Sequence, residues 1–140
     1  MTTGCIFCRI VAGTAEASIV YDDALTTAFM DVRQPSRGHV LVVPKRHVRD
    51  ILALDDATGA AVISTVARVA RAVQAAFAPD GMNIMQSNGE AAGQEVFHLH
   101  MHVLPRHSGD GLLRMYDASP GLPPRAELDS QAAALREAIG

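Results

Sequence analysis

The 140-residue sequence is poor in aromatic side chains, with no Trp, 2 Tyr and 4 Phe. Proteins that bind single-stranded nucleic acids stack the bases on such side chains, so this shortage argues against a nucleic acid polymer as partner. The formal net charge is −3, whereas nonspecific binding of polyanions needs a clustered basic face. A single small phosphate ligand remains compatible with this composition.

Long hydrophobic runs are also lacking, and no apolar run approaches the roughly 18 residues that a membrane helix needs. The first residues, MTTG, show no basic stretch followed by an apolar one, so we expect no secretory signal, no membrane partner and a cytoplasmic protein. The length corresponds to one domain, which buries about two-thirds of its unfolded surface and needs neither a disulfide nor a metal to form a core.

The strongest helical pattern runs from Asp56 to about Ala78. Asp55 or Asp56 can cap its start, and the turn residues 79–81 (PDG) end it. Apolar side chains recur along one face with helical spacing, namely Val62, Val66, Val69, Val73 and Phe77. This pattern predicts a helix that packs on the core.

Short segments with strand character lie on both sides of this helix. The expected strands cover residues 18–21, 26–31, 39–43, 82–86 and 97–104. A helix between groups of strands, without regular βαβ alternation, predicts an α+β fold with a mainly antiparallel, five-stranded sheet, one long helix and short helices. We expect one domain over residues 1–107 and a variable C-terminal tail over 108–140, with a short helix near 125–139.

Three of the six histidines occupy alternate positions, His98, His100 and His102. A strand alternates its side chains, so the three imidazoles share one face while Leu99 and Met101 share the other. A core histidine usually occurs singly, so the row favours a functional site. Zinc with an open coordination position and a nucleophilic imidazole with positioning neighbours both fit this spacing.

The loop before the histidines, residues 87–94 (SNGEAAGQ), is small and polar. Its side chains and backbone offer hydrogen-bond donors that suit phosphate oxygens. A metal site would more naturally add an acidic ligand close by. The loop therefore favours phosphate chemistry at the imidazoles.

Cys5 and Cys8 are the only cysteines. In a chain that is not exported, this spacing suggests metal or redox chemistry rather than a disulfide. A thioredoxin-type motif follows a strand, and the four residues before Cys5 leave no room for one. This argues against a thioredoxin-type redox site, and a closed zinc site would need two ligands beyond the two thiolates.

Residues 93–106 (GQEVFHLHMHVLPR) resemble the signature of the histidine triad (HIT) family of nucleotide hydrolases and transferases. Further segments fall where small HIT proteins carry similar ones, namely 5–10 (CIFCRI), 29–32 (FMDV), 38–47 (GHVLVVPKRH) and 87–89 (SNG). The resemblance covers about residues 5–107. It implies a HIT-like fold, a homodimer, a purine nucleotide substrate of AMP or GMP type, and no organic cofactor.

The resemblance also implies a reaction at the α-phosphorus of a nucleotide. His100 would be the nucleophile and form a phosphohistidine that water hydrolyses, while His102 would contact phosphate oxygens or the leaving group. Backbone amides near Glu95 would stabilise charge on the phosphoryl oxygens together with three side chains, those of Ser87, Asn88 and Gln94. Many relatives carry a small hydroxyl residue at the position of Glu95, and an acidic group there favours a cationic leaving group such as an amine.

A nucleoside pocket and a zinc site follow from the same resemblance. Asp31 would accept hydrogen bonds from the ribose hydroxyls. The base would pack against Phe7, Ile10, Val32 and Leu41, for which ordinary core packing is the alternative interpretation. His47 and His98 would complete a structural zinc site with the two cysteines, and His98 would anchor the catalytic strand.

The function that the sequence favours is hydrolysis of purine nucleoside phosphoramidates or related adenylated compounds. A dinucleoside polyphosphate hydrolase, a nucleotide-binding regulatory module with little turnover, and a zinc-binding structural protein are the alternatives. His100→Asn separates catalysis from binding, since an enzyme would lose turnover and keep nucleotide affinity. The leaving group and the choice between adenine and guanine stay open.

Overall fold

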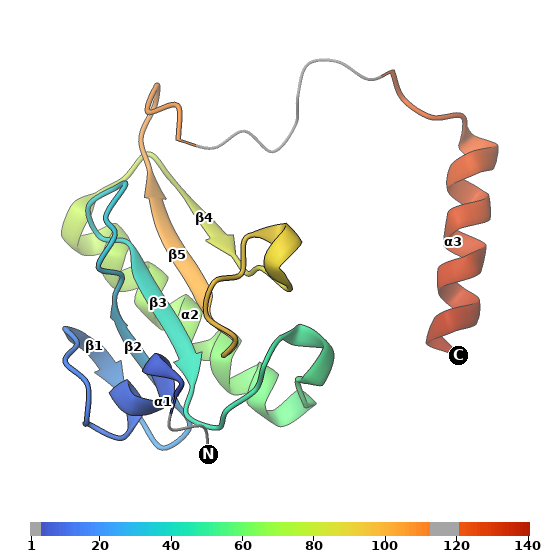
Figure 1. Ribbon diagram of the computed structural model, residues 1–140. Coiled ribbons are helices and arrows are strands. Elements are labelled where there is room, and N and C mark those ends of the chain that lie inside the picture. The colour runs from blue at the N-terminus through green and yellow to red at the C-terminus, as the bar shows by residue number, and fades with distance from the viewer. Residues whose placement is uncertain (1–3, 113–120) are drawn as a thin grey trace.

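A computed structural model describes residues 4–112 and 121–140 of the chain (Figure 1). The elements follow one another as α1 (Ile6–Val11), β1 (Ile19–Asp22), β2 (Thr26–Met30), β3 (Val40–Pro44), η1 (Ile51–Ala53), α2 (Asp56–Phe77), β4 (Gly81–Met85), η2 (Glu90–Ala92), β5 (Met101–Arg106) and α3 (Arg125–Ile139). The strands form one antiparallel sheet in the order β1-β2-β3-β5-β4. The predicted α+β class is therefore confirmed.

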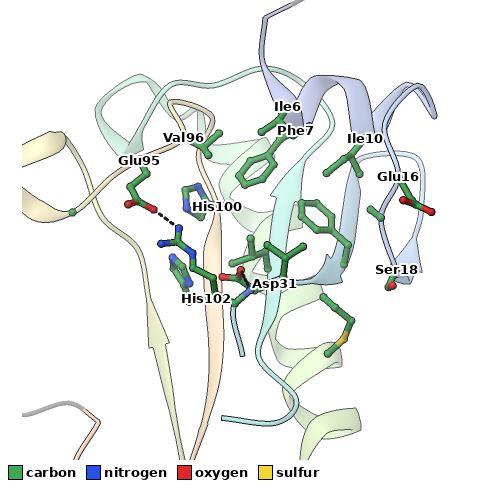
Figure 2. A pocket seen from close by; sticks show the side chains of 17 residues that line it. Ile6, Phe7, Ile10, Glu16, Ser18, Asp31, Glu95, Val96, His100 and His102 are labelled. Carbon is green, nitrogen blue, oxygen red and sulfur yellow. Dashed lines mark hydrogen bonds and ion pairs between the residues drawn. The ribbon is translucent and has the colours of Figure 1, made fainter. Parts of the chain in front are cut away.

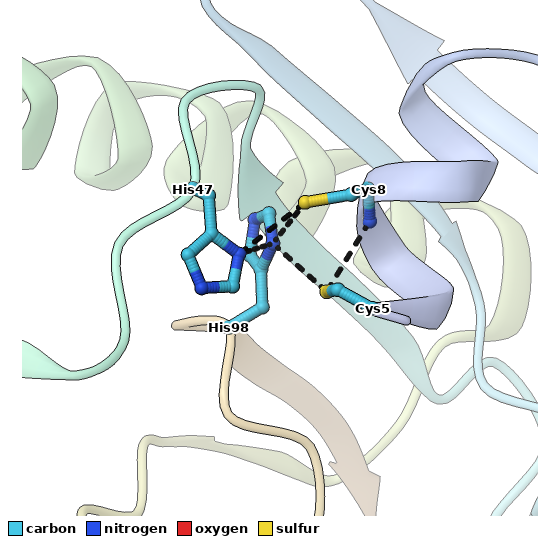
Figure 3. A group of neighbouring side chains, drawn as sticks. All are labelled: Cys5, Cys8, His47 and His98. Carbon is cyan, nitrogen blue, oxygen red and sulfur yellow. Dashed lines mark hydrogen bonds between the residues drawn. The ribbon is translucent and has the colours of Figure 1, made fainter. Parts of the chain in front are cut away.

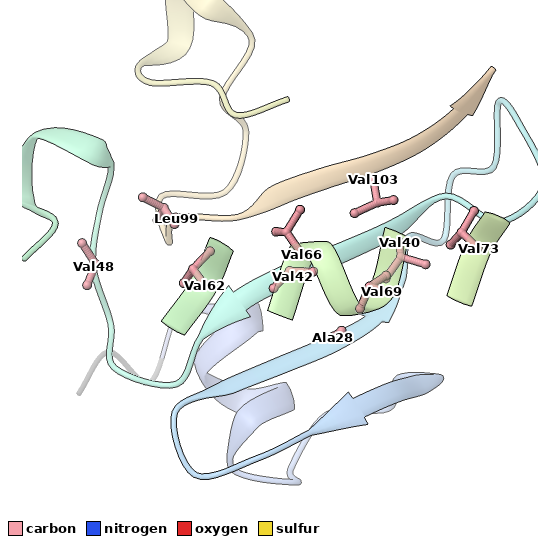
Figure 4. Close-up of a cluster of buried hydrophobic side chains, with 10 residues drawn as sticks. All are labelled: Ala28, Val40, Val42, Val48, Val62, Val66, Val69, Val73, Leu99 and Val103. Atoms are coloured by element: carbon pink, nitrogen blue, oxygen red, sulfur yellow. The ribbon is translucent and has the colours of Figure 1, made fainter. Parts of the chain in front are cut away.

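Helix α2 begins and ends where the sequence predicts. The Asp55 carboxylate accepts a hydrogen bond from the backbone N–H of Thr58, and Ala78 stops the helix in the left-handed region with φ of 46°. The predicted valine stripe packs on the sheet in a core of ten buried side chains (Figure 4). Within the described part of the chain, α2 is the one helix that is long and apolar enough to cross a membrane. A helix that packs on a core can have the same length and composition, so this is weak evidence for a membrane span.

Alternation along β3 divides the side chains of the sheet between its two faces. Val40 and Val42 lie in the core beneath α2, whereas Leu41 and Val43 point to the opposite face. There they pack with Phe7 of α1 and Phe29 of β2. Since α1 is only six residues long, it covers a small part of this second face. The cavity described below opens on the same face.

Strand β5 begins at Met101, four residues later than predicted. The ladder between β3 and β5 ends with the pair Val42 and Met101, and Leu99 instead donates its N–H to the carbonyl of Val48 at 2.6 Å. The chain has left the ladder here, which lets His98 reach a different set of partners. The predicted alternation of side chains is nevertheless present, because Leu99 and Val103 are buried beneath α2.

The other strands begin and end within one residue of their expected bounds. The sequence pattern did not locate helix α1. Its N-cap is Cys5, whose Sγ accepts a hydrogen bond from the N–H of Cys8. Helix α3 occupies the predicted range in the C-terminal tail and buries none of its residues. Part of that tail, residues 113–120, lies outside the described residues.

Candidate active site and metal centre

A cavity of about 720 Å³ opens on the sheet face opposite α2 (Figure 2). Its walls come from α1, the segment before β1, the end of β2, β3, the chain that leads into β5, and β5 itself. This volume lies in the range of about 300–1,000 Å³ that is typical of small-molecule sites. The lining side chains include Phe7, Ile10, Asp31, Val32, Leu41, Glu95, His100 and His102. Eight of the sequence-predicted active-site residues therefore meet in one cavity.

The protonation of His100 follows from its hydrogen bond to the backbone. Its Nδ1 lies 2.8 Å from the carbonyl oxygen of His98, and a carbonyl can only accept. The proton is therefore on Nδ1, and Nε2 keeps its lone pair. Burial lowers the pKa of His100, which keeps the ring neutral near pH 7. The ring of Phe7 packs edge-on against it at 5.1 Å between centroids. His100 is thus equipped as a nucleophile.

His102 is held by a fourth histidine, His39. The Nδ1 of His102 lies 2.9 Å from Nε2 of His39, whose own Nδ1 lies 3.1 Å from the carbonyl oxygen of Arg33. Burial lowers the pKa of His102 to about 4. The sequence did not give His39 a functional role, although a polar residue at the start of an apolar strand was an available signal. His39 orients His102 and leaves its Nε2 for a ligand.

Asp31 follows β2 directly and faces the cavity. One carboxylate oxygen accepts a hydrogen bond from the backbone N–H of Arg33 at 2.9 Å, and the other lies 3.6 Å from Nδ1 of His39. The side chain is 12% exposed. This geometry fixes the carboxylate at the cavity wall, where its remaining lone pairs can accept hydrogen bonds from a bound ligand.

The four apolar residues predicted for the base pocket all line the cavity. Phe7 and Leu41 are buried and also belong to the core cluster on this face, so wall and core are the same side chains here. Val32 is 96% exposed and forms part of the rim. The two interpretations left open for Leu41 therefore do not exclude each other.

The side chains of Ser87, Asn88 and Gln94 do not line this cavity. Gln94 is buried; its Oε1 accepts from the N–H of Gly89, and its Nε2 donates to the carbonyls of Arg49 and Val96. The side-chain oxygen of Asn88, Oδ1, accepts a hydrogen bond from the N–H of Ile51. The sequence predicted phosphate contacts for these residues, but Gln94 and Asn88 use their amides to shape the loop that carries Glu95.

Glu95 lines the cavity and forms an ion pair with Arg33. The sequence analysis did not identify Arg33 as a site residue. The hydrogen bond from Arg33 lowers the pKa of the Glu95 carboxyl. Arg33 follows Asp31 by two residues, so the pair links the end of β2 to the chain before β5. Figure 2 shows the contact as a dashed line beside His100 and His102.

A second cluster unites the four predicted zinc ligands, Cys5, Cys8, His47 and His98 (Figure 3). The Nδ1 of His98 lies 3.5 Å from each sulfur, Nδ1 of His47 lies 3.3 Å from Sγ of Cys8, and the two nitrogens are 3.2 Å apart. A tetrahedral zinc ion with bonds of about 2.3 Å to sulfur and 2.0–2.1 Å to nitrogen holds sulfur and nitrogen ligands about 3.5 Å apart. It holds two nitrogen ligands about 3.4 Å apart. The donor set therefore fits zinc.

The orientation of His98 supports the same assignment. Its Nε2 lies 2.8 Å from the carbonyl oxygen of Pro44, so Nε2 carries the proton and Nδ1 turns its lone pair to the sulfurs. The ring is fully buried, and burial lowers its pKa, which favours the neutral form that binds metals. Burial also raises the pKa of the Cys5 thiol. The cluster joins segments that are far apart in the sequence.

Comparisons with known proteins agree with this fold and site. Residues 12–109 match the HIT domain family. The chain is 44% identical over 108 residues to Protein hit from Bacillus subtilis, covering 76% of this chain and 74% of that protein. It is 37% identical over 102 residues to adenosine 5'-monophosphoramidase hnt1 from Schizosaccharomyces pombe, covering 73% and 74%.

Solved structures show the same resemblance along the whole chain. A HIT family protein from Bacillus anthracis is 35% identical, with a TM-score of 0.92 and coverage of 100% of both chains. A zinc-bound histidine triad family protein from Mycobacterium smegmatis is 38% identical, with a TM-score of 0.74 and coverage of 96% of this chain and 97% of that one.

The fold and the imidazole-lined cavity define an α+β protein with a small-molecule site built around histidines. Within that class, the chain belongs to the histidine triad (HIT) family.

Proposed function

We propose that this protein hydrolyses purine nucleoside phosphoramidates or related adenylated compounds at the α-phosphorus. The observation that carries the proposal is the state of His100: its Nδ1 proton is held by the carbonyl of His98, while its Nε2 lone pair is available in a cavity of nucleotide size. The name of the fission yeast relative, an adenosine 5'-monophosphoramidase, supports the substrate class.

The reaction proceeds in two steps at His100. Nε2 attacks the α-phosphorus, the P–N bond breaks, and the amine leaves with its electron pair and takes up a proton. The nucleotidyl-histidine is then attacked by water, which releases the nucleoside monophosphate and a proton and returns the neutral imidazole. His102 contacts the phosphoryl oxygens or the leaving group. Asp31 holds the ribose, and the apolar wall with Phe7 and Leu41 receives the purine.

Zinc is proposed as a structural cofactor on Cys5, Cys8, His47 and His98. Its part is to tie α1 and the segment after β3 to the chain that carries His100, since His98 is both a ligand and the acceptor for His100 Nδ1. The zinc-bound relative from Mycobacterium smegmatis supports the metal. We further propose a homodimer, on the family resemblance, and a cytoplasmic location, as the sequence leads us to expect.

A substrate panel tests the reaction class. The protein is incubated separately with adenosine phosphoramidate, an adenylated amine, a dinucleoside polyphosphate, and the guanosine phosphoramidate, and the rates of nucleotide release are ranked. We expect nucleotide release to be fastest from the phosphoramidates. A dinucleoside polyphosphate as the fastest substrate would establish the alternative hydrolase instead.

Trapping the intermediate tests the nucleophile. Rapid quenching with a labelled adenylated substrate should give an acid-labile, base-stable label on His100. His100→Asn should reduce turnover by at least about a thousandfold and keep nucleotide affinity, because removal of a nucleophile leaves only binding and electrostatic stabilisation. Label on another residue would refute this role. Nucleotide binding with no turnover of any compound would favour the regulatory module.

A further inference from the structure

A second cavity of about 520 Å³ leads to the cluster of cysteines and histidines. Cys5 and His47 line this cavity, and both side chains are only half-buried. Gly4 and Arg49, which also line it, are exposed, so the cavity opens to solvent. A small solute that enters it therefore meets one sulfur and one imidazole of the proposed zinc site.

The other half of the cluster is closed to solvent. Cys8 is 8% exposed, and His98 is fully buried. The ligand atoms of the four residues all lie within 4.8 Å of one another, and the sulfurs of both cysteines lie 3.5 Å from Nδ1 of His98 (Figure 3). The accessible sulfur of Cys5 thus has a sheltered sulfur within short reach.

The two cysteines are placed to form a disulfide with each other. Cys5 caps the first turn of α1, and its Sγ accepts a hydrogen bond from the N–H of Cys8 at 3.4 Å. Residues three apart in a helical turn are neighbours, and a disulfide requires close approach of both β-carbons. The bond can therefore form by movement within one turn, without displacement of the sheet.

The two sulfurs differ in their exposure to oxidants. Zinc holds a coordinating thiol as the thiolate, which is the form that oxidants attack. Susceptibility also rises with exposure. Cys5 combines thiolate character with access from the second cavity, whereas Cys8 is shielded. We therefore expect Cys5 to react first and Cys8 to react with the oxidised Cys5.

We propose that Cys5 and Cys8 form an oxidation site for hydrogen peroxide, at which a disulfide replaces the bound metal. This inference rests on the proposed zinc site and adds a chemical reaction of its ligands. Unlike a thioredoxin-type site, the pair reacts with peroxide and not with the disulfide of another protein.

The reaction has two steps. The Cys5 thiolate attacks one oxygen of the peroxide, the O–O bond breaks, and hydroxide leaves, which gives a sulfenic acid on Cys5. The Cys8 thiolate then attacks the sulfur of Cys5 and expels a second hydroxide. The two sulfurs lose two electrons, the peroxide gains two, and both hydroxides take up protons from solvent.

Oxidation at this site reaches the catalytic segment. Two imidazoles remain as ligands, and a closed tetrahedral zinc site needs four, so His98 loses its metal anchor. Phe7 lies between the two cysteines in the sequence, and its ring packs 5.1 Å from that of His100. A disulfide in this turn therefore changes a wall of the nucleotide cavity as well, and hydrolysis should slow in step with the loss of zinc.

Zinc release and thiol loss test the proposal without any nucleotide. The zinc-loaded protein is treated with hydrogen peroxide beside a chromogenic zinc chelator, and a sample with chelator alone is the control. One zinc should appear for every two thiols lost. The protein should become two hydrogen atoms lighter than its reduced, metal-free form, with Cys5 linked to Cys8 in a peptide map. A dithiol reductant followed by zinc should restore both thiols and metal.

Variants locate the reactive sulfur and its route of access. In Cys8→Ser the reaction should stop at a sulfenic acid on Cys5, which dimedone traps, and Cys5→Ser should form no disulfide within the chain. Gly4→Trp should slow zinc release severalfold by covering the cavity mouth, where an added Cβ meets no atom within 4 Å. Gly121→Trp, with the same free space but in neither cavity, is the matched control and should keep the unmodified rate.

The outcomes separate this inference from the proposals on which it rests. Zinc that stays bound at peroxide concentrations that consume free cysteine would overturn the oxidation site and leave the zinc site in place. Equal release from Gly4→Trp and the unmodified protein would refute access through the second cavity. An unmodified protein that binds no zinc would overturn both the zinc site and this inference. A protein that releases zinc as expected but hydrolyses no phosphoramidate would overturn the proposed reaction alone.

Discussion

Single hydrogen bonds to backbone carbonyls determine what two of the triad imidazoles can do. The carbonyl of His98 holds the proton of His100 on Nδ1, and the carbonyl of Pro44 holds the proton of His98 on Nε2. Neighbours in one row thus expose different nitrogens, Nε2 in the nucleotide cavity and Nδ1 at the cysteines. Histidine therefore serves two kinds of chemistry at alternate positions of one segment.

Asp31 is expected to distinguish ribose from deoxyribose. Asp31→Ala should weaken the binding of a ribonucleotide by about 1.5–3 kcal/mol, the range for hydrogen bonds to a charged group, and that of the deoxyribonucleotide by less. Isothermal titration with the paired nucleotides measures the difference. An equal loss for both would refute contact between Asp31 and the ribose hydroxyls.

His102 is expected to make the stability of the fold depend on pH. Its pKa is about 4 in the folded protein and 6.5 in its reference state, so between these values the unfolded chain binds more protons and folding weakens as the pH falls. One such group changes the free energy of unfolding by at most about 1.4 kcal/mol per pH unit. Urea unfolding at several pH values should show a shallower dependence in His102→Gln, and an unchanged slope would contradict the assignment.

At the scale of elements, the site depends on where β5 leaves its ladder. From Met101 onward the strand pairs with β3, while the residues before it turn to Val48 and Pro44. This departure brings His98 to the cysteines of α1 and keeps His100 and His102 at the cavity. The cluster of Cys5, Cys8, His47 and His98 consequently connects α1, the chain after β3 and the chain before β5.

Loss of the proposed zinc site should loosen this connection. Metal analysis should find about one zinc per chain, and Cys5→Ser or His47→Ala should lower both zinc content and Tm. A loss of about 2 kcal/mol corresponds to roughly 7 °C in a domain of this size. Activity should fall in part, because His98 also positions His100.

His100→Ala is the matched control for these variants, since it removes an imidazole of the same row and should keep the metal. Loss of zinc in His100→Ala together with its retention in Cys5→Ser would place the ion in the triad itself and exclude the assignment to the cysteines.

At the scale of the whole molecule, the helix of the C-terminal tail is exposed along its length. Helix α3 buries none of its residues, and its Leu135 and Ile139 are 64% and 85% exposed. At the edge of the sheet, β4 exposes Ile84 to 42%. Together with the family resemblance, these surfaces support the proposed homodimer, with the C-terminal tail packing on it.

Sedimentation should therefore give a mass of twice 14.8 kDa for the full chain. A chain that ends at residue 112 should dissociate at higher concentration than the full chain, because the apolar side chains of α3 would no longer be buried between copies. Zinc content serves as the control for folding of the shortened chain. A monomeric full chain, or equal dissociation of both, would contradict packing of α3 on the dimer.

Local periodicity was sufficient for the α+β class, the bounds of α2 and the alternation along the histidine row, because these depend on spacing within one segment. The family resemblance predicted which residues line the nucleotide cavity and which four form the cysteine and histidine cluster. Only the tertiary structure decided the partners of buried polar groups: Gln94 holds a loop, His39 orients His102, and Arg33 pairs with Glu95. Such partners come from distant segments, and which donor meets which acceptor depends on how those segments pack.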